Sequence, residues 1–202
     1  MKIFCIGFNK TGTTSLQNLF SGSGFKVAPQ TPFEYNFNSY KFGNFSTFIN
    51  MIKEDYPHCN FYQDVPFSLP NFYKTLYQEF PDAYFILSTR TTPEMWYNSL
   101  CSSHQKSFPN RYNTPSEIEH NYKGWVFDYL TKGLGSPKYD PYNKNILIEA
   151  YNNHNNGVKD FFKGNNNLIE INLSTPKDFN KLEQSLGIKF TPTSFPHLNK
   201  SQ

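Results

Sequence analysis

Residues 2–20 read KIFCIGFNKTGTTSLQNLF, and this stretch decides the fold. Residues 2–8 form a nearly continuous apolar run, which is typical of a strand buried on both faces of a parallel sheet. Residues 13–20 then place Leu16, Leu19 and Phe20 at helical spacing, and two glycines follow as a stop signal. The stretch therefore predicts a buried strand, a loop rich in Gly, Lys and Thr, and an amphipathic helix.

The order of strand and helix continues along the rest of the chain. We expect further strands at residues 25–28, 59–65, 83–89 and 167–173. Helices are expected over residues 44–56, 69–80, 93–105 and 174–186, with two longer helices between 116 and 163 and an irregular stretch at 29–43. This order predicts an α/β fold in a single domain over residues 1–202, with a mostly parallel central sheet of about five strands flanked by helices.

Composition and charge exclude two classes of protein. No run of about 18 apolar residues is present and the mean hydropathy is −0.64, so we expect no membrane span. A formal net charge of +3, without a block of like charges, gives no support for nucleic-acid binding. The same charge is compatible with a small anionic ligand.

The cysteines indicate a reducing environment. Cys5, Cys59 and Cys101 are odd in number, widely spaced and without the pattern of a zinc site. We therefore expect a cytoplasmic protein with no disulfide framework and no metal. The amino-terminal apolar run passes directly into the Gly/Lys/Thr loop and not into a small-residue cleavage site, so no signal peptide is expected.

The loop GFNKTGTTSL, residues 7–16, has the chemistry of an anion-binding cradle. Backbone N–H groups of a loop between a strand and a helix, together with the positive end of the helix dipole, bind phosphate or sulfate. The loop that binds ATP or GTP has the order GxxxxGK[ST]. Here Thr13 follows Gly12, and the lysine is Lys10, two residues before that glycine. This order removes the usual magnesium arrangement and disfavours ordinary nucleotide hydrolysis.

This loop resembles the phosphosulfate-binding loop of sulfotransferases that use 3'-phosphoadenosine 5'-phosphosulfate (PAPS), in particular the branch of small P-loop sulfotransferases. The resemblance implies a P-loop NTPase-like sulfotransferase fold. It also implies that the 5'-phosphosulfate of PAPS is bound by Lys10, Thr11, Gly12, Thr13, Thr14 and Ser15.

A second segment, STRTTPEMWYNSL at residues 88–100, resembles the 3'-phosphate site of the same family. There an Arg after a strand and a Ser two helical turns later bind one phosphate, which here implies Arg90 and Ser99. A guanidinium fork suits a phosphate dianion better than an ammonium does. The spacing is one residue longer than is usual in the family, so Ser102 is an alternative to Ser99. An ion-pairing role at the surface is the alternative for Arg90.

A third segment, NFYQDVPF at residues 60–67, ends a predicted strand at Asp64 and is similar to the DxPF-type segment of the small sulfotransferases. That branch also has an FPDAxFI strand and a late FPHxN segment, found here at residues 80–86 and 195–199. The resemblance implies that Asp64 activates the acceptor, with Lys10 at the bridging oxygen of the leaving phosphate. Capping of the following turn is the alternative for Asp64, and His58 and His104 are further candidate bases.

These segments favour an enzyme that transfers the sulfuryl group of PAPS to a hydroxyl or amine of a small-molecule or carbohydrate acceptor, without a metal. The alternatives are a P-loop kinase for a nucleoside or small molecule, and a non-catalytic nucleotide-binding domain. Ser15 stands where larger family members often carry a tryptophan that stacks on adenine. Trp96 is a candidate for that role, although its place in a predicted helix favours the core. Aromatic residues in 108–130 suit an acceptor wall, a lid or core packing.

Overall fold

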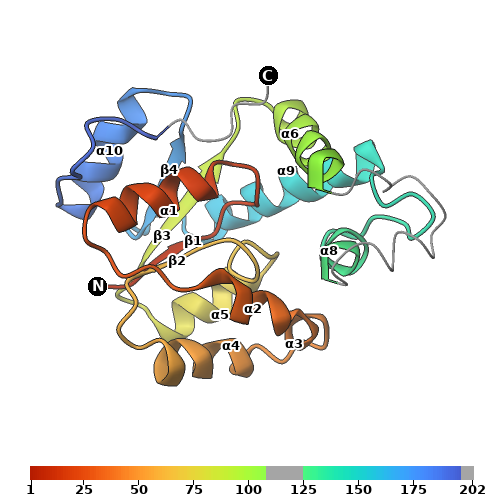
Figure 1. Ribbon diagram of the computed structural model, residues 1–202, viewed down its shortest axis with the longest axis horizontal. Coiled ribbons are helices and arrows are strands. Elements are labelled where there is room, and N and C mark those ends of the chain that lie inside the picture. Colours follow the sequence, from red (N-terminus) through yellow and green to blue (C-terminus); the bar gives the residue numbers. More distant parts are fainter. Residues whose placement is uncertain (108–124, 197–202) are drawn as a thin grey trace.

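Four parallel strands form the centre of the molecule (Figure 1). The computed structural model describes residues 1–107 and 125–196. Within them the sheet has the order β2-β1-β3-β4, and every neighbouring pair is parallel. The strands are β1 (Ile3–Cys5), β2 (Phe61–Tyr62), β3 (Tyr84–Thr89) and β4 (Leu168–Asn172). The α/β class with a parallel central sheet is confirmed.

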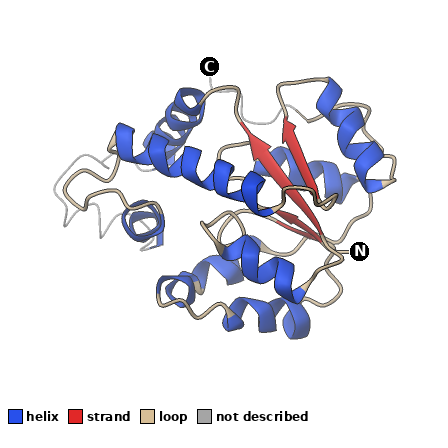
Figure 2. Cartoon of the chain, turned by 180° about the vertical axis from the view of Figure 1, so that it is seen from behind, coloured by secondary structure: helices blue, strands red, loops and turns tan. Residues whose placement is uncertain are grey.

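Helices cover both faces of this sheet (Figure 2). Ile3 and Cys5 of β1 pack with α1 (Thr13–Gly22) and α10 (Lys177–Leu186) on one face. Phe4 of β1 points to the other face, where it packs with α5 (Phe72–Glu79) and the end of α9 (Lys144–Phe161). Burial on both sides explains the continuous apolar sequences of β1, β2 and most of β3. The edge strand β4 differs, because it reads Leu-Ile-Glu-Ile-Asn and buries only its two isoleucines.

A third apolar cluster lies beyond the carboxyl end of β1. It joins Phe8 to α6 (Pro93–Ser107), to the π-helix η2 (Tyr129–Gly133) and to α9. Trp96 of α6 is fully buried and stacks on Tyr151 of α9, with 4.7 Å between ring centroids. Trp96 is thus a core residue, as its helical position favours. The loop that follows β1 rests on this aromatic base.

The segment 25–28 differs from its prediction. It forms one parallel bridge, Val27 to Phe61, and no strand, so the sheet has four strands among the described residues where about five were expected. Gly24, at a φ of 84°, turns the chain before this segment, and Pro29 follows it directly. Because β2 offers only two residues at this edge, no ladder can extend beyond the single bridge.

Residues 29–43 are also more regular than expected. They form two short helices, α2 (Gln30–Tyr35) and α3 (Phe37–Lys41). Phe33 of α2 is buried in the cluster around Phe4, and Phe37 of α3 is buried in the cluster around Phe8, so one ring anchors each short helix. Pro32 lies in the first turn of α2, where the missing N–H has no helical partner to lose.

The remaining helices follow their predicted segments. Residues 44–56 form α4 (Ser46–Asn50), which continues into the π-helix η1 (Met51–Asp55). Of the two helices expected between 116 and 163, the second is α9, and the first corresponds to α8 (Trp125–Asp128) with η2. Residues 108–124 lie outside the described part of the chain. None of the described helices is long and apolar enough to cross a membrane.

Gly7, two residues after β1, lies directly against the backbone of Ser88 in β3, and its substitution is expected to destabilise the fold. A Cβ at Gly7 would lie 2.2 Å from the carbonyl oxygen of Ser88, an overlap with backbone that no side-chain rotation relieves. We expect Gly7→Ala to lower the free energy of unfolding by about 3 kcal/mol or more in urea denaturation. Gly22→Ala is the matched control, because nothing lies within 4 Å of its Cβ. Equal stability of the two variants would contradict this account.

Candidate functional site

Three loops meet at one edge of the sheet. They follow β1, β2 and β3, which are neighbours in the order β2-β1-β3. Because these strands are parallel, their carboxyl ends lie on the same edge, where ligands bind in open α/β sheets. The three segments selected from the sequence, around Lys10, Asp64 and Arg90, are thus brought together by the topology.

The loop after β1 is closed by its own hydrogen bonds. The Thr11 hydroxyl donates to the carbonyl oxygen of Phe8 at 2.6 Å, and its oxygen lies 2.6 Å from the Ser88 hydroxyl of β3. Lys10 and Gly12 both have a positive φ, 66° and 102°. A Cβ at Gly12 would lie 2.5 Å from the Leu173 side chain, so only glycine fits there.

The amino terminus of α1 leaves its first amides open. Gly12 is the residue before α1 and supplies no side-chain cap. The first bond of the helix runs from the N–H of Leu16 to the carbonyl oxygen of Gly12 at 3.0 Å. The amides of Thr13, Thr14 and Ser15 therefore have no partner inside the helix. This is the donor set that binds a phosphate or sulfate at a helix amino terminus.

The side chains of this loop divide into two groups. Thr11, Thr13 and Ser15 are buried, so their side chains face the protein. Thr14 is exposed and Lys10 is half-buried. Of the six residues that the sequence selected, Lys10 and Thr14 offer side chains to a ligand, Thr13 and Ser15 offer amides, and Thr11 and Gly12 shape the loop.

Asn9 is held from two sides. The indole N–H of Trp96 donates to the Asn9 carbonyl oxygen at 3.0 Å, and the Tyr129 hydroxyl donates to Asn9 Oδ1 at 2.8 Å. Asn9 is 4% exposed, so these bonds lie out of water. They fix the residue directly before Lys10. Sequence reasoning missed this clamp, because its two donors lie 87 and 120 residues away from Asn9 in the chain.

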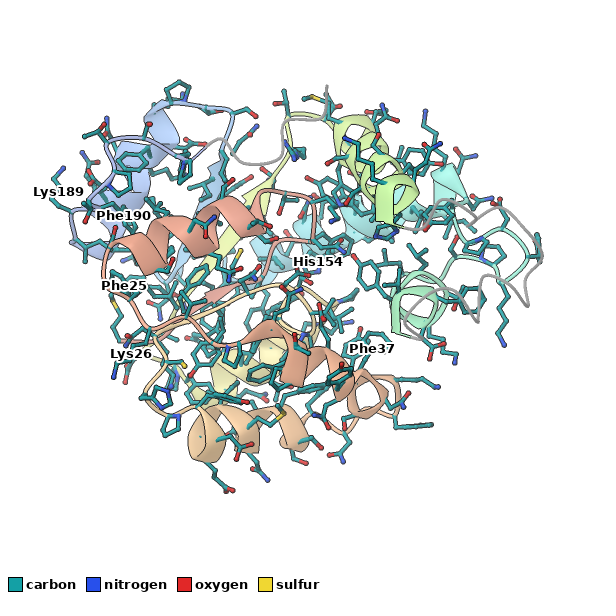
Figure 3. The ribbon with its side chains drawn as sticks, viewed as in Figure 1. Phe25, Lys26, Phe37, His154, Lys189 and Phe190 are labelled. Carbon is teal, nitrogen blue, oxygen red and sulfur yellow. The ribbon has the colours of Figure 1, made fainter. Side chains whose placement is uncertain are left out.

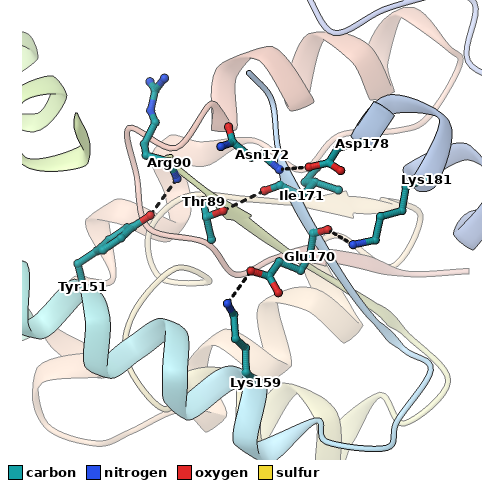
Figure 4. Close-up of polar contacts among 9 residues, drawn as sticks. All are labelled: Thr89, Arg90, Tyr151, Lys159, Glu170, Ile171, Asn172, Asp178 and Lys181. Carbon is teal, nitrogen blue, oxygen red and sulfur yellow. Dashed lines mark hydrogen bonds and ion pairs between the residues drawn. The ribbon is translucent and has the colours of Figure 1, made fainter. Parts of the chain in front are cut away.

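Arg90 joins the loop after β3 to the loop after β1. Its Nε donates to the carbonyl oxygen of Lys10 at 2.8 Å, and its backbone N–H donates to the Tyr151 hydroxyl at 2.9 Å. Figure 4 shows the guanidinium extending away from Tyr151. Burial lowers the pKa of Arg90, and the Tyr151 oxygen acts in the opposite sense. Within the described residues Arg90 forms no ion pair, so its two terminal amino groups are available to an anion.

The serines and histidines of the prediction occupy different environments. Ser99 is half-buried on α6 and Ser102 is exposed one turn later. His104 is buried, and its Nδ1 lies 2.9 Å from the Tyr142 hydroxyl, which makes it part of the packing around α6. His58 is exposed at the amino end of β2, the opposite edge of the sheet from the three loops. Of the three candidate bases, only Asp64 lies beside the cradle.

Asp64 both caps its own turn and faces the loop after β1. Its Oδ1 accepts the N–H of Val65 at 3.0 Å, and its Oδ2 accepts the Thr13 hydroxyl at 3.3 Å. Burial raises the pKa of the Asp64 carboxyl above 3.8, and the positive charge of Lys10 and these two hydrogen bonds oppose the rise. A carboxylate that binds a proton more readily than usual thus stands next to a lysine and an anion cradle.

The family model of the sulfotransferase domain matches residues 2–202. The chain is a member of the sulfotransferase domain family. No curated protein matches the chain significantly. Membership shows the general reaction, sulfuryl transfer, and a sulfotransferase needs an anion cradle beside a group that accepts a proton. The described part of this sulfotransferase contains no group of three or more His, Cys, Asp or Glu side chains placed to hold a metal ion.

The Asn9 clamp makes Tyr129 a positioning residue of the sulfotransferase. Tyr129→Phe removes the donor to Asn9 Oδ1 and keeps the ring, so we expect a loss of about 1–3 kcal/mol in the free energy of unfolding. Faster hydrogen exchange at the amides of residues 9–12 should accompany it. Tyr139→Phe is the control, because Tyr139 is 84% exposed. Unchanged hydrogen exchange at these amides in Tyr129→Phe would show that the bond from Tyr129 to Asn9 does not hold the loop in place.

Proposed function

We propose that this sulfotransferase takes its sulfuryl group from PAPS and transfers it to a hydroxyl or amine of a small-molecule or carbohydrate acceptor. The observation that carries the proposal is the bond from Arg90 Nε to the Lys10 carbonyl, which couples two anion-binding groups at one sheet edge. A ligand with two separate anionic groups, as in a 3'-phosphorylated nucleotide with a 5'-phosphosulfate, fits such a pair.

In the proposed complex the 5'-phosphosulfate lies at the amino terminus of α1. The open amides of Thr13, Thr14 and Ser15 donate to its oxygens, as the first turn of a helix does for an anion. Lys10 supplies a full positive charge beside them. Thr11 and Gly12 act through the shape of the loop, because the Thr11 hydroxyl is already bonded to Phe8 and lies against Ser88.

The 3'-phosphate is assigned to the terminal amino groups of Arg90. With its Nε held by Lys10, the guanidinium has one fixed edge and one edge that remains for a phosphate. Ser99, half-buried on α6, is the second ligand of this phosphate, and the exposed Ser102 is the alternative.

Asp64 serves as the general base in this proposal. The acceptor oxygen or nitrogen attacks sulfur and its proton passes to Asp64, while the bond from sulfur to the bridging oxygen of the donor breaks. Lys10 stabilises the negative charge that develops on the leaving phosphate. The raised pKa of Asp64 supports this role, since a stronger base removes the acceptor proton more readily.

One observation favours a second candidate, a nucleotide-binding domain without turnover. Both carboxylate oxygens of Asp64 accept hydrogen bonds within the protein, as expected of a residue that only caps a turn. One of those partners is Thr13 of the cradle itself, at 3.3 Å, which supports the catalytic role instead. The two candidates differ in whether Asp64→Asn affects turnover.

The proposed location is the cytoplasm. Cys5, Cys59 and Cys101 are all free, and Cys5 and Cys59 are buried. Free thiols support a reducing compartment.

The donor assignment predicts a nucleotide preference. Isothermal titration is expected to show magnesium-independent binding of 3'-phosphoadenosine 5'-phosphate that is at least tenfold tighter than binding of AMP. Arg90→Lys should weaken the former about 10- to 100-fold and should weaken AMP binding much less, because the forked contact to the 3'-phosphate is lost for the former alone, whereas the bond to the Lys10 carbonyl is lost for both nucleotides. Lys163→Gln, an exposed cation before β4, is the control. Magnesium-dependent binding of ATP would instead support the kinase alternative.

The role of Asp64 predicts a pH profile. Turnover with PAPS and a mixed panel of phenols, sugars and amines should fall as the pH is lowered through a pKa above 3.8, because the protonated carboxyl cannot accept the acceptor proton. Asp64→Asn should lower turnover at least about 100-fold and keep the affinity for the product nucleotide. Full turnover by Asp64→Asn would exclude Asp64 as the base, and no turnover by the wild type with intact nucleotide binding would favour the non-catalytic candidate.

A further inference from the structure

Three buried aromatic side chains link the loop after β1 to the loop after β3. Phe8 belongs to the first loop, Trp96 to α6 and Tyr151 to α9, and none of the three is more than 2% exposed. The ring centroids of Trp96 and Tyr151 lie 4.7 Å apart, and the Phe8 centroid lies 5.6 Å from that of Trp96 and 5.9 Å from that of Tyr151. Each ring therefore packs on the other two, and dense packing leaves this three-ring cluster little freedom to move.

Two rings of the cluster carry a polar atom that bonds to a loop of the site. The indole N–H of Trp96 donates to the carbonyl oxygen of Asn9 at 3.0 Å, and the Tyr151 hydroxyl accepts the backbone N–H of Arg90 at 2.9 Å. Arg90 Nε then donates to the carbonyl oxygen of Lys10, at 2.8 Å. Because Asn9 and Lys10 are neighbours in the chain, these contacts form a closed circuit that runs through Lys10, Arg90, Tyr151, Trp96 and Asn9.

Helix α9 anchors Tyr151 within this circuit. Three residues after Tyr151, His154 Nε2 lies 2.8 Å from the carbonyl oxygen of Ile6 (Figure 3). The His154 ring also stacks on Phe8, with 4.4 Å between the ring centroids. The helix that carries the Tyr151 hydroxyl is thus fixed to the chain on both sides of Gly7, directly before the anion cradle.

The circuit holds Arg90 at two points. The Tyr151 bond lies at the base of the residue, on its backbone N–H, as Figure 4 shows, and the Lys10 bond lies near the end of the side chain, on Nε. With the Lys10 bond alone, the guanidinium could pivot about one carbonyl oxygen. Two bonds set the distance between the terminal amino groups of Arg90 and the open amides of α1, so the site is preorganised for one separation of charges.

We propose that Tyr151 is a positioning residue for the Arg90 guanidinium, and that the closed circuit through Trp96 makes the site select ligands by the separation of their two anionic groups. Tyr151 touches no ligand and acts through Arg90. The positioning of Arg90 is independent of the donor, whereas the selection of a nucleotide by the place of its second phosphate rests on the proposed function.

The positioning role is tested by heteronuclear NMR, as solvent exchange of the Arg90 Nε–H in the full chain without nucleotide. The sequence contains two arginines, Arg90 and Arg111, so loss of one signal in Arg90→Lys assigns it. Tyr151→Phe removes the hydroxyl and keeps the ring, and it should speed this exchange at least about fivefold. Tyr62→Phe is the matched control, because it removes another buried hydroxyl, bonded to the Tyr56 carbonyl oxygen at 2.8 Å.

The control separates positioning from stability. Tyr62→Phe should leave the exchange of the Arg90 Nε–H within about twofold of the wild type, since its lost bond lies outside the circuit. Unchanged exchange in Tyr151→Phe would overturn the positioning role. Equal acceleration in both variants would overturn it as well, because it would reflect a general loss of stability.

The selection is tested by isothermal titration with 3'-phosphoadenosine 5'-phosphate and with its isomer that carries the second phosphate at the 2' position. The wild type should bind the 3' isomer at least about tenfold tighter, and Tyr151→Phe should reduce this preference to about threefold or less. Tyr62→Phe should keep the preference of the wild type. An unchanged preference in Tyr151→Phe would refute the selection. Failure of both isomers to bind the wild type would refute the proposed donor together with the selection, and the exchange measurement decides the role of Tyr151 in either case.

Discussion

The contact between the loop after β1 and the end of β3 is the constraint on which the rest of the site depends. Gly7 lets the two strands approach, and the Thr11 and Ser88 hydroxyl oxygens then lie 2.6 Å apart in a fully buried position. A hydrogen bond out of water is strong and costly to break without replacement. The same contact places the carbonyl of Lys10 within reach of Arg90, so the cradle and the guanidinium form one unit.

Helix α9 supports this unit from the opposite face of the sheet. Tyr151 accepts the backbone N–H of Arg90, and His154 donates to the carbonyl of Ile6 just before the loop. Farther along the helix, Lys159 forms an ion pair with Glu170 of β4 at 2.6 Å (Figure 4). One helix thus bonds to the residue that follows β1, to β4 and to the residue that follows β3.

The sequence predicted those features that short segments determine. The apolar runs predicted the strands. The loop at residues 7–16 indicated an anion cradle, because a strand, a glycine-containing loop and a helix follow one another directly in the sequence. Features that depend on distant partners were missed. Asn9 contacts Tyr129 only in the folded chain. The short helices that contain Phe33 and Phe37 form because these two rings are buried in the core. The predicted strand at 25–28 was wrong, because whether this segment pairs depends on the length of its neighbour β2. That length cannot be read from residues 25–28 themselves.

Hydrogen bonds within the protein hold the cradle in place. Bonds to Phe8, Arg90, Trp96 and Tyr129 hold residues 9–11. An anion that enters such a loop orders little further backbone, so the entropic cost of association is small. For the proposed donor, a preorganised loop of this kind implies a rigid encounter: diffusion and the charges of Lys10 and Arg90 would set the association rate, and the hydrogen bonds would set the lifetime of the complex.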